Sequence, residues 1–115
     1  MTDATASIMA QFEAQIEENN AALANVNDDA VDNYIVVCEE VAIGFTIENN
    51  RVIKSFSCGG AIKATRFSSY NATNVAKTVR NGRGTVALAW YIKDALKAEN
   101  ERIQSCIEML RTKSV

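Results

Sequence analysis

The chain of 115 residues contains no histidine and no proline. Histidine is the commonest general base, the usual activator of a serine or cysteine nucleophile, and the commonest metal ligand. Its absence leads us to expect a protein that is not an enzyme and that uses no metal ion and no other cofactor. The absence of proline leaves every backbone N–H available as a donor, so no rigid residue interrupts the long periodic segments.

Cysteine is scarce, and long apolar runs are missing. Cys38, Cys58 and Cys106 are odd in number, lie far apart and form no C-x-x-C pair. This pattern argues against a disulfide framework or a structural zinc site, so we expect a reducing, cytoplasmic environment. No apolar run reaches membrane-spanning length, and the N-terminal residues MTDATASIMAQ carry no positive charge before a hydrophobic stretch. We therefore expect neither a signal peptide nor a membrane anchor.

Basic residues are missing from the first part of the chain, and acidic residues from the middle. Residues 1–50 hold ten carboxylates and no lysine or arginine, whereas residues 51–93 hold eight basic residues and no aspartate or glutamate. Residues 94–115 carry four of each sign, which leaves a net charge of −2. Segregated charge attracts a charged partner. That partner is either a bound anion or the acidic half of the chain itself.

The length allows one domain, 1–115, with a single modest core. Residues 1–26 predict an acidic amphipathic helix, because apolar residues recur at spacings of three and four from Met9 to Val26. Asn19 occupies one position of this apolar seam, an arrangement by which coiled coils fix register and partner number. The seam packs either on the chain's own sheet or on a helix of another subunit, and both interpretations stay open.

Residues 34–67 predict an antiparallel meander of three or four strands. The run VAIGFTI alternates apolar residues on one face, and the following Asn-Asn pair suits a two-residue hairpin turn, since asparagine tolerates positive φ. We expect this turn to set Ile47 opposite Val52 and, further along, Ile43 opposite Phe56. A Gly-Gly pair then leads into the run AIKATRF, which we expect to add the last strand.

Helical periodicity returns after the strands. Residues 69–81 predict a short helix that stops at Asn81-Gly82. Residues 85–112 predict a long helix capped by Thr85, with Glu99 as the polar interruption in its apolar stripe. Its length of roughly 40 Å exceeds what short strands cover, so part of it packs on the N-terminal helix or on a copy of itself. The predicted fold is therefore α+β: an N-terminal helix, a three- to four-stranded antiparallel meander, a short helix and a long C-terminal helix.

The basic segment 63–83, KATRFSSYNATNVAKTVRNGR, is the candidate binding site. It combines cations, two aromatic rings and two amides with the starts of two predicted helices. Helix starts attract anions, arginine forks bind phosphate through paired contacts, and an aromatic ring stacks on a base. The predicted ligand-binding residues are Lys63, Arg66, Phe67, Tyr70, Asn71, Asn74, Lys77, Arg80 and Arg83.

Within this set each residue type has an expected role. Arg66, Arg80 and Arg83 bind phosphate, one of the two aromatic rings stacks on a planar group, and the asparagines supply polar specificity. A different pairing stays open, in which the same arginines meet the acidic turn 28–32 of a neighbouring subunit. That turn lacks the spacing of a calcium-binding loop, so we expect no metal there.

Three other features receive structural interpretations. The run Asn81-Gly-Arg-Gly-Thr85 lacks the P-loop pattern, and we interpret its glycines as a compact corner between two helices. Glu39 and Glu40 are adjacent on a predicted strand and point to opposite faces, which is unsuitable for a catalytic pair. Trp90 and Tyr91 are interpreted as core or interface residues.

Two functions are compatible with these observations. The first is a non-enzymatic homo-oligomer that binds a small phosphorylated, nucleotide-like ligand near a subunit boundary. The second is a protein-directed inhibitor or adaptor, whose acidic N-terminal half docks on a basic host protein. A nucleic-acid polymer is not expected as a partner, because ten carboxylates in the first half of the chain would repel a long polyanion.

The layout also resembles a family type. A meander bearing A-T-R-F, a small N-A-T-N-V-A-K helix, an N-G-R-G corner and a long C-terminal helix are similar to small phage accessory proteins of the Thoeris anti-defence type. Those proteins sequester cyclic-ADP-ribose-like or cyclic-nucleotide signals as oligomeric sponges. The resemblance covers the order of elements over about residues 34–112. It implies sequestration of a nucleotide-like signal in the host cytoplasm, and it leaves the acidic N-terminal helix unexplained.

Overall fold

The computed structural model describes residues 2–113 and has the predicted α+β class. Its elements, in chain order, are α1 (Asp3–Asn25), β1 (Tyr34–Cys38), β2 (Val41–Glu48), β3 (Arg51–Ser57), the 3₁₀ turn η1 (Ala61–Lys63), α2 (Ser69–Ala76), β4 (Leu88–Tyr91) and α3 (Ile92–Lys113). The order of an N-terminal helix, antiparallel strands, a short helix and a long C-terminal helix is confirmed. None of the helices between residues 2 and 113 has both the length and the apolar character of a membrane span.

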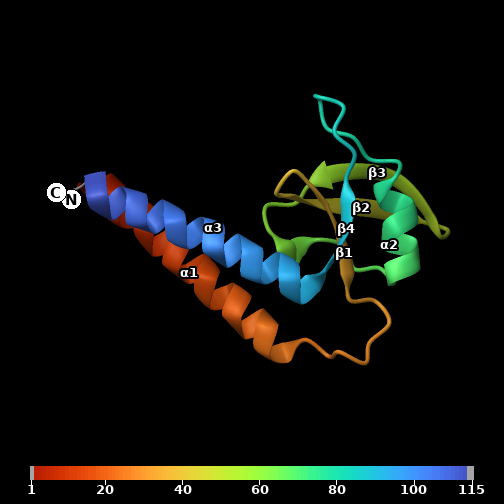
Figure 1. Ribbon diagram of the computed structural model, residues 1–115, viewed down its shortest axis with the longest axis horizontal. Coiled ribbons are helices and arrows are strands. Elements are labelled where there is room, and N and C mark those ends of the chain that lie inside the picture. Colours follow the sequence, from red (N-terminus) through yellow and green to blue (C-terminus); the bar gives the residue numbers. More distant parts are fainter. Residues whose placement is uncertain (1, 114–115) are drawn as a thin grey trace.

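One antiparallel sheet, with strand order β3-β2-β1-β4, lies between two helical layers (Figure 1). The side chains of β1 alternate between the two faces of the sheet. Val36 and Cys38 share a buried cluster with Ala72 of α2, while Ile35 shares one with Leu96 of α3. The α1–α3 pair therefore covers one face of the sheet, and α2 covers the other.

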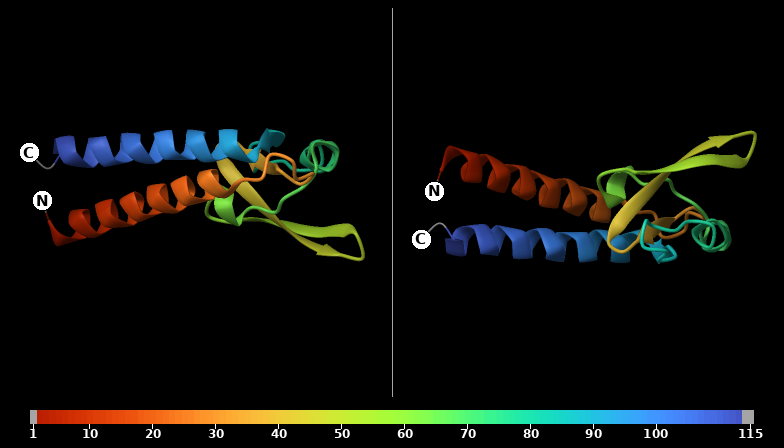
Figure 2. Two further views of the ribbon diagram at one scale, coloured as in Figure 1. Left: turned by 90° about the horizontal axis from the view of Figure 1, so that it is seen from below. Right: turned by 90° about the horizontal axis from the view of Figure 1, so that it is seen from above.

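The helices α1 and α3 lie side by side in opposite directions, and both extend beyond the sheet (Figure 2). Met9 of α1 is buried together with Ile103 and Ile107 of α3, and Phe12 and Ile16 pack against them. The apolar seam predicted in the N-terminal helix thus packs on the last helix of the same chain. This contact also accommodates the part of α3 that is too long for the strands to cover.

The β2–β3 hairpin turns at the predicted Asn-Asn pair, where both residues have positive φ. Ile47 pairs with Val52, which confirms the predicted register next to the turn. A bulge just before Ile47 then shifts the register, so that Ile43 pairs with Ser57 and not with Phe56. Every residue of β3 is exposed, and the hairpin projects from the body of the protein (Figure 2).

The long C-terminal helix starts later than predicted. The sequence indicated a helix over 85–112, but α3 begins at Ile92, and residues 88–91 form the strand β4. This strand pairs with β1, with Ile35 opposite Trp90. Pairing with a buried strand satisfies the backbone groups of β4, and this long-range contact outweighs the local helical pattern.

The last predicted strand and the short helix also differ from expectation. The run AIKATRF forms η1 and then a single bridge, in which the backbones of Tyr34 and Phe67 exchange hydrogen bonds of 2.9 and 2.8 Å. Helix α2 ends at Ala76, short of the predicted 69–81, and residues 77–87 form a loop that leads back to the sheet. The predicted meander 34–67 therefore supplies three strands, and β4 supplies the fourth.

Candidate functional site

The nine predicted binding residues do not converge on one place. Lys63 lies in η1 beside α1, where it lines a hollow with Gln15 and Glu18. Phe67 is buried, and its ring meets Phe45 edge to face with 5.5 Å between the ring centroids. Phe67 therefore belongs to the core and cannot stack on a ligand, contrary to the sequence-based expectation.

Five more residues of the set are exposed on or next to α2. They are Arg66, Tyr70, Asn71, Asn74 and Lys77. The helix begins as predicted, because Ser68 Oγ accepts a hydrogen bond of 3.2 Å from the backbone N–H of Asn71. None of these five side chains forms a hydrogen bond or an ion pair with the rest of residues 2–113. Their place in a binding site stays a prediction.

Arg80 and Arg83 line one open groove of about 500 Å³, which we call the arginine groove. It lies on the face of the sheet that α2 covers, and its apolar floor consists of Val41, Ile43 and Val79. The complete lining is Cys38, Glu39, Val41, Ile43, Ser55, Phe56, Ser57, Val79, Arg80, Asn81, Gly82 and Arg83. Two of the three predicted phosphate-binding arginines are thus brought together, and the third lies outside the groove.

The loop that carries both arginines is held by internal hydrogen bonds. Asn81 Oδ1 accepts from the backbone N–H groups of Arg83 (2.9 Å) and Thr85 (3.0 Å). At the base of the loop, Arg80 and Val86 form an antiparallel bridge. The segment predicted as a corner between two helices is therefore a hairpin-like loop, shaped by an asparagine side chain at its start.

Glu39 and Glu40 form the turn between β1 and β2, with positive φ angles of 44° and 70°, and do not lie on a strand. The carboxylate of Glu39 accepts hydrogen bonds from Thr85 Oγ1 (2.6 Å) and from Arg83 Nη2. The bond from Thr85 is the largest cause that lowers the pKa of Glu39, which is therefore ionised at neutral pH. On the other side of the turn, Arg102 Nη2 donates to the carbonyl oxygen of Glu40 at 3.3 Å.

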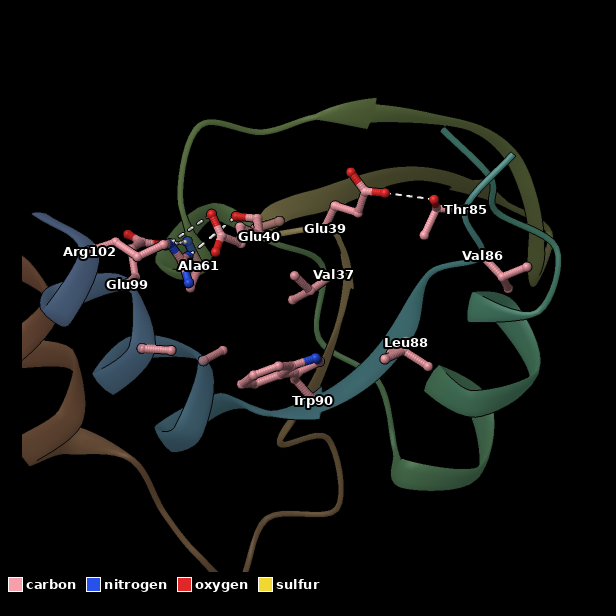
Figure 3. A pocket seen from close by; sticks show the side chains of 13 residues that line it. Val37, Glu39, Glu40, Ala61, Thr85, Val86, Leu88, Trp90, Glu99 and Arg102 are labelled. Atoms are coloured by element: carbon pink, nitrogen blue, oxygen red, sulfur yellow. Dashed lines mark hydrogen bonds and ion pairs between the residues drawn. The ribbon is translucent and has the colours of Figure 1, made fainter. Parts of the chain in front are cut away.

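A second groove, of about 320 Å³, lies between the sheet and α3 on the opposite face (Figure 3). We call it the α3 groove. Val37, Leu88 and Trp90 form its apolar floor. The complete lining is Val37, Glu39, Glu40, Ala42, Ala61, Thr85, Val86, Leu88, Trp90, Ala95, Ala98, Glu99 and Arg102.

Sequence reasoning missed the α3 groove because it assigned Trp90 to the core or to an interface. The signal that would have found it is the alternation of Val86, Leu88 and Trp90 with small alanines. That alternation predicts a strand, and in the structure its alanines face α2 while its larger residues line the α3 groove on the other face. Glu39 lines both grooves, so the β1–β2 turn lies between them.

Glu99 is a buried carboxylate at one end of the α3 groove (Figure 3). Its Oε1 accepts from Asn19 Nδ2 (3.1 Å) and Gln15 Nε2 (3.2 Å), and its Oε2 accepts from the backbone N–H of Ala61 (2.9 Å). These bonds compensate for the loss of water around the charge. Glu99 therefore connects α1, α3 and η1, and it is engaged with the protein.

The acidic turn that was expected to meet arginines of a neighbour is partly engaged within the chain. Asp28 accepts hydrogen bonds from the hydroxyl of Tyr91 and from Lys93 Nζ (2.9 Å). The bond from Tyr91 is the main cause that lowers the pKa of Asp28, and the same bond raises the pKa of Tyr91 to about 12. Asp29 and Asp32 remain exposed.

The chain matches no known family model, and neither a curated protein nor a solved structure is significantly similar to it. Its function is therefore argued from the two grooves themselves. One has two arginines at its border, and the other has an apolar floor with carboxylates at its rim.

Proposed function

We propose that the chain binds a small phosphorylated, nucleotide-like ligand in the arginine groove and retains it without chemical change. The observation that carries this proposal is the position of Arg80 and Arg83, which border one groove from a loop held by Asn81. Arginine forks bind phosphate through paired, charge-assisted contacts. The lack of histidine in the chain supports binding without turnover.

The charges of the arginine groove favour an anion. Its lining holds two arginines against one carboxylate, that of Glu39. Within residues 2–113, the side chain of Arg80 donates only to the carbonyl oxygen of Lys77, at 3.3 Å. The side chain of Arg83 is 78% exposed although it pairs with Glu39. Charges beyond about 8 Å are screened at physiological ionic strength, so the acidic helix α1 does not cancel this local field.

The remainder of the groove fits the other part of such a ligand. The volume of about 500 Å³ lies within the range of about 300–1,000 Å³ that is usual for small-molecule sites. Val41, Ile43 and Val79 offer an apolar surface for a planar group, and Ser55 and Ser57 offer hydroxyl groups at the border. The stacking role was expected of Phe67 or Tyr70, but Phe67 is buried in the core and Tyr70 does not line this groove. The aliphatic side chains offer the planar group a surface in their place.

Binding of adenosine monophosphate, adenosine and inorganic phosphate, measured by thermal shift and calorimetry, tests this proposal. The monophosphate is expected to stabilise the protein and adenosine is not. Arg80→Ala is expected to weaken binding of the monophosphate about tenfold or more. Lys63→Ala removes the same charge outside the groove and is the matched control. Equal losses in the two variants, or no stabilisation by any phosphorylated compound, would contradict the proposal.

Self-association is part of the proposed function. All residues of β3 are exposed, and Val52, Ile53 and Phe56 are large apolar residues among them. Such a surface is typical of a contact between subunits. An oligomer that binds the ligand and does not release it would withhold the ligand from its receptor. The family resemblance implies this sponge role for a phage protein in a host cytoplasm. Sedimentation that fits a monomer at micromolar concentration would contradict this part.

A second candidate function rests on α1. Asp3, Glu17 and Glu18 are exposed, and none of them forms an ion pair with another of residues 2–113, whereas Glu13 pairs with Arg111 at 3.7 Å. An acidic helix of this kind fits an inhibitor or adaptor that binds a basic host protein. We compare formation of a complex with a host protein in the double variant E17Q/E18Q and in R80A. Loss of the complex in E17Q/E18Q and its retention in R80A would favour this function over ligand binding.

A further inference from the structure

Three apolar side chains at the edge of the sheet remain in contact with solvent. Val86, Leu88 and Trp90 are 39%, 63% and 36% exposed. Leu88 and Trp90 are alternate residues of β4, and Val86 lies two residues before the strand. All three line the α3 groove. Across the groove, α3 presents the small residues Ala95 and Ala98, which leave the space open. An apolar hollow of this kind on the surface of a protein marks a binding site.

The rim of the α3 groove has the opposite charge to that of the arginine groove. Glu39, Glu40 and Glu99 line it, and Arg102 is its single lining cation. Arg102 already pairs with Glu40, with 3.9 Å between Nε and the carboxylate, and donates to the same residue's carbonyl oxygen. Arg83, which lies outside this lining, pairs with Glu39, so the three carboxylates stand against two guanidinium groups. The rim therefore keeps an excess of negative charge, which favours a cation over a phosphate.

We propose that the α3 groove binds an organic cation, namely an amine carried on an apolar or aromatic body. The body contacts Trp90 and Leu88 on the floor of the groove, and the ammonium group lies toward the carboxylates at the rim (Figure 3). The indole of Trp90 offers the body a large apolar contact, and a carboxylate at the rim attracts the ammonium group. The protein would then have two sites of opposite charge preference on the two faces of one sheet.

The two sites are linked through Glu39, and this link rests on the proposed function of the arginine groove. Glu39 lines both grooves and pairs with Arg83. A phosphate that binds Arg83 competes with Glu39 for the guanidinium group and leaves the Glu39 carboxylate available to a cation. Phosphate and amine therefore each strengthen the binding of the other, because such coupling is reciprocal.

The fluorescence of Trp90, the single tryptophan of the chain, reports directly on the α3 groove. Phenethylamine, 2-phenylethanol and 3-phenylpropanoate have similar bodies and carry positive, zero and negative charge. The amine is expected to change the fluorescence saturably and to bind roughly three- to tenfold more tightly than the alcohol, with the acid weakest. Equal binding of amine and alcohol, or no saturable change with the amine, would overturn the proposal.

Variants that keep the tryptophan locate the site. Ala98→Leu narrows the groove and is expected to abolish amine binding, and Leu88→Ala is expected to weaken it several-fold. Met109→Ala removes another exposed apolar side chain, far along α3 and outside the groove, and is the control. Circular dichroism checks that each variant is folded. Amine binding that survives in A98L, or that is lost equally in M109A, would place the site elsewhere.

A separate measurement tests the coupling. Inorganic phosphate, compared with sodium chloride of equal ionic strength, is expected to lower the Kd of phenethylamine in the native protein and not in Arg83→Ala. An unchanged Kd in the native protein would overturn the coupling. Because the amine is first titrated without phosphate, failure of the α3 site and failure of the arginine groove are distinguishable.

Discussion

Asn19 Nδ2 donates a hydrogen bond of 3.1 Å to Glu99 Oε1 across the α1–α3 interface. Both residues are buried, and each is the polar member of an otherwise apolar helix face. Asn19 also donates to Asn100 Oδ1 at 2.9 Å, and Glu99 accepts from Ala61. A single shift of either helix along the other would leave these groups unpaired, so the contact fixes the register of the helical pair.

Replacing Glu99 with glutamine tests this contact. In the native protein both carboxylate oxygens of Glu99 accept hydrogen bonds, from Asn19, Gln15 and Ala61. The glutamine would replace one of these oxygens with an NH₂ group, which cannot accept, so at least one hydrogen bond is lost and two donors face each other. We expect a loss of about 1–3 kcal/mol in the free energy of unfolding, measured by urea denaturation. Glu101→Gln, exposed on the same helix, is expected to change it by less than about 0.5 kcal/mol. Equal losses would refute the role of Glu99.

The contact between Asp28 and Tyr91 predicts an unusual alkaline titration. Tyr91 has a pKa of about 12, above the ordinary value of 10.0, chiefly because its hydroxyl donates to Asp28. The contact therefore contributes stability below pH 10 that is lost as the pH rises toward 12. We expect Asp28→Asn to lower the pKa of Tyr91, followed by tyrosine NMR, and Asp29→Asn to leave it unchanged. An equal effect of both variants would contradict this assignment.

The same contact acts with the opposite sign in acid. The pKa of Asp28 is lowered, mainly by the hydrogen bond from Tyr91 and also by Lys93. Its contribution to stability is therefore present at neutral pH and is lost as the pH falls below the ordinary aspartate value of 3.8. Acid unfolding of D28N is expected to depend less on pH in this range than that of the native protein. Parallel acid unfolding curves would speak against the contact.

The sequence predicted elements whose signals are local. The Asn-Asn pair fixed the hairpin turn and set Ile47 opposite Val52. The register further from the turn was wrong, because the bulge before Ile47 follows from packing and has no local signature. Residues 88–91 were assigned to a helix, since their pairing with β1 is a long-range contact that local periodicity does not report.

The candidate site was predicted only in part, for a related reason. Arg80 and Arg83 share a groove because one short loop carries both of them. Lys63 and the exposed residues of α2 lie on different sides of the sheet, although they are close in the sequence. The α3 groove is assembled from the strands β1, β2 and β4, the helix α3, η1, the β1–β2 turn and the loop before β4, and no single segment of the sequence contains it.

Glycine at position 40 should make the β1–β2 turn more favourable. Glu40 has a φ of 70°, which costs a residue with a side chain about 1 kcal/mol that glycine does not incur. The contact of its exposed carboxylate with Arg102, at 3.9 Å, contributes little. We expect Glu40→Gly to raise the free energy of unfolding by about 0.5–1 kcal/mol. Glu48→Gly, on a strand without positive φ, is expected to lower it. Destabilisation of both variants to the same degree would contradict the strain at Glu40.

Gly44 has no side chain because the ring of Phe56 lies over it. A Cβ atom at this position would lie 2.6 Å from Phe56 Cε2 and 2.8 Å from Cζ. Alanine normally stabilises a strand relative to glycine by about 0.5–1 kcal/mol, but here displacement of the ring is expected to outweigh that gain and cost about 1–3 kcal/mol. Gly82→Ala, where nothing lies within 4 Å of the added atom, is the control and is expected to be neutral or stabilising.

The partner of Gly44 is identified by a double-mutant cycle. Phe56 is 47% exposed, so its removal leaves no closed cavity. In the Phe56→Ala background, Gly44→Ala is expected to cost less than in the native protein, because the ring is the closest obstacle and only the looser contact with Cys58 Cβ, at 3.2 Å, remains. The coupling energy between the two substitutions should therefore exceed about 0.5 kcal/mol in denaturant unfolding. Additive effects would show that Cys58, and not Phe56, excludes a side chain at position 44.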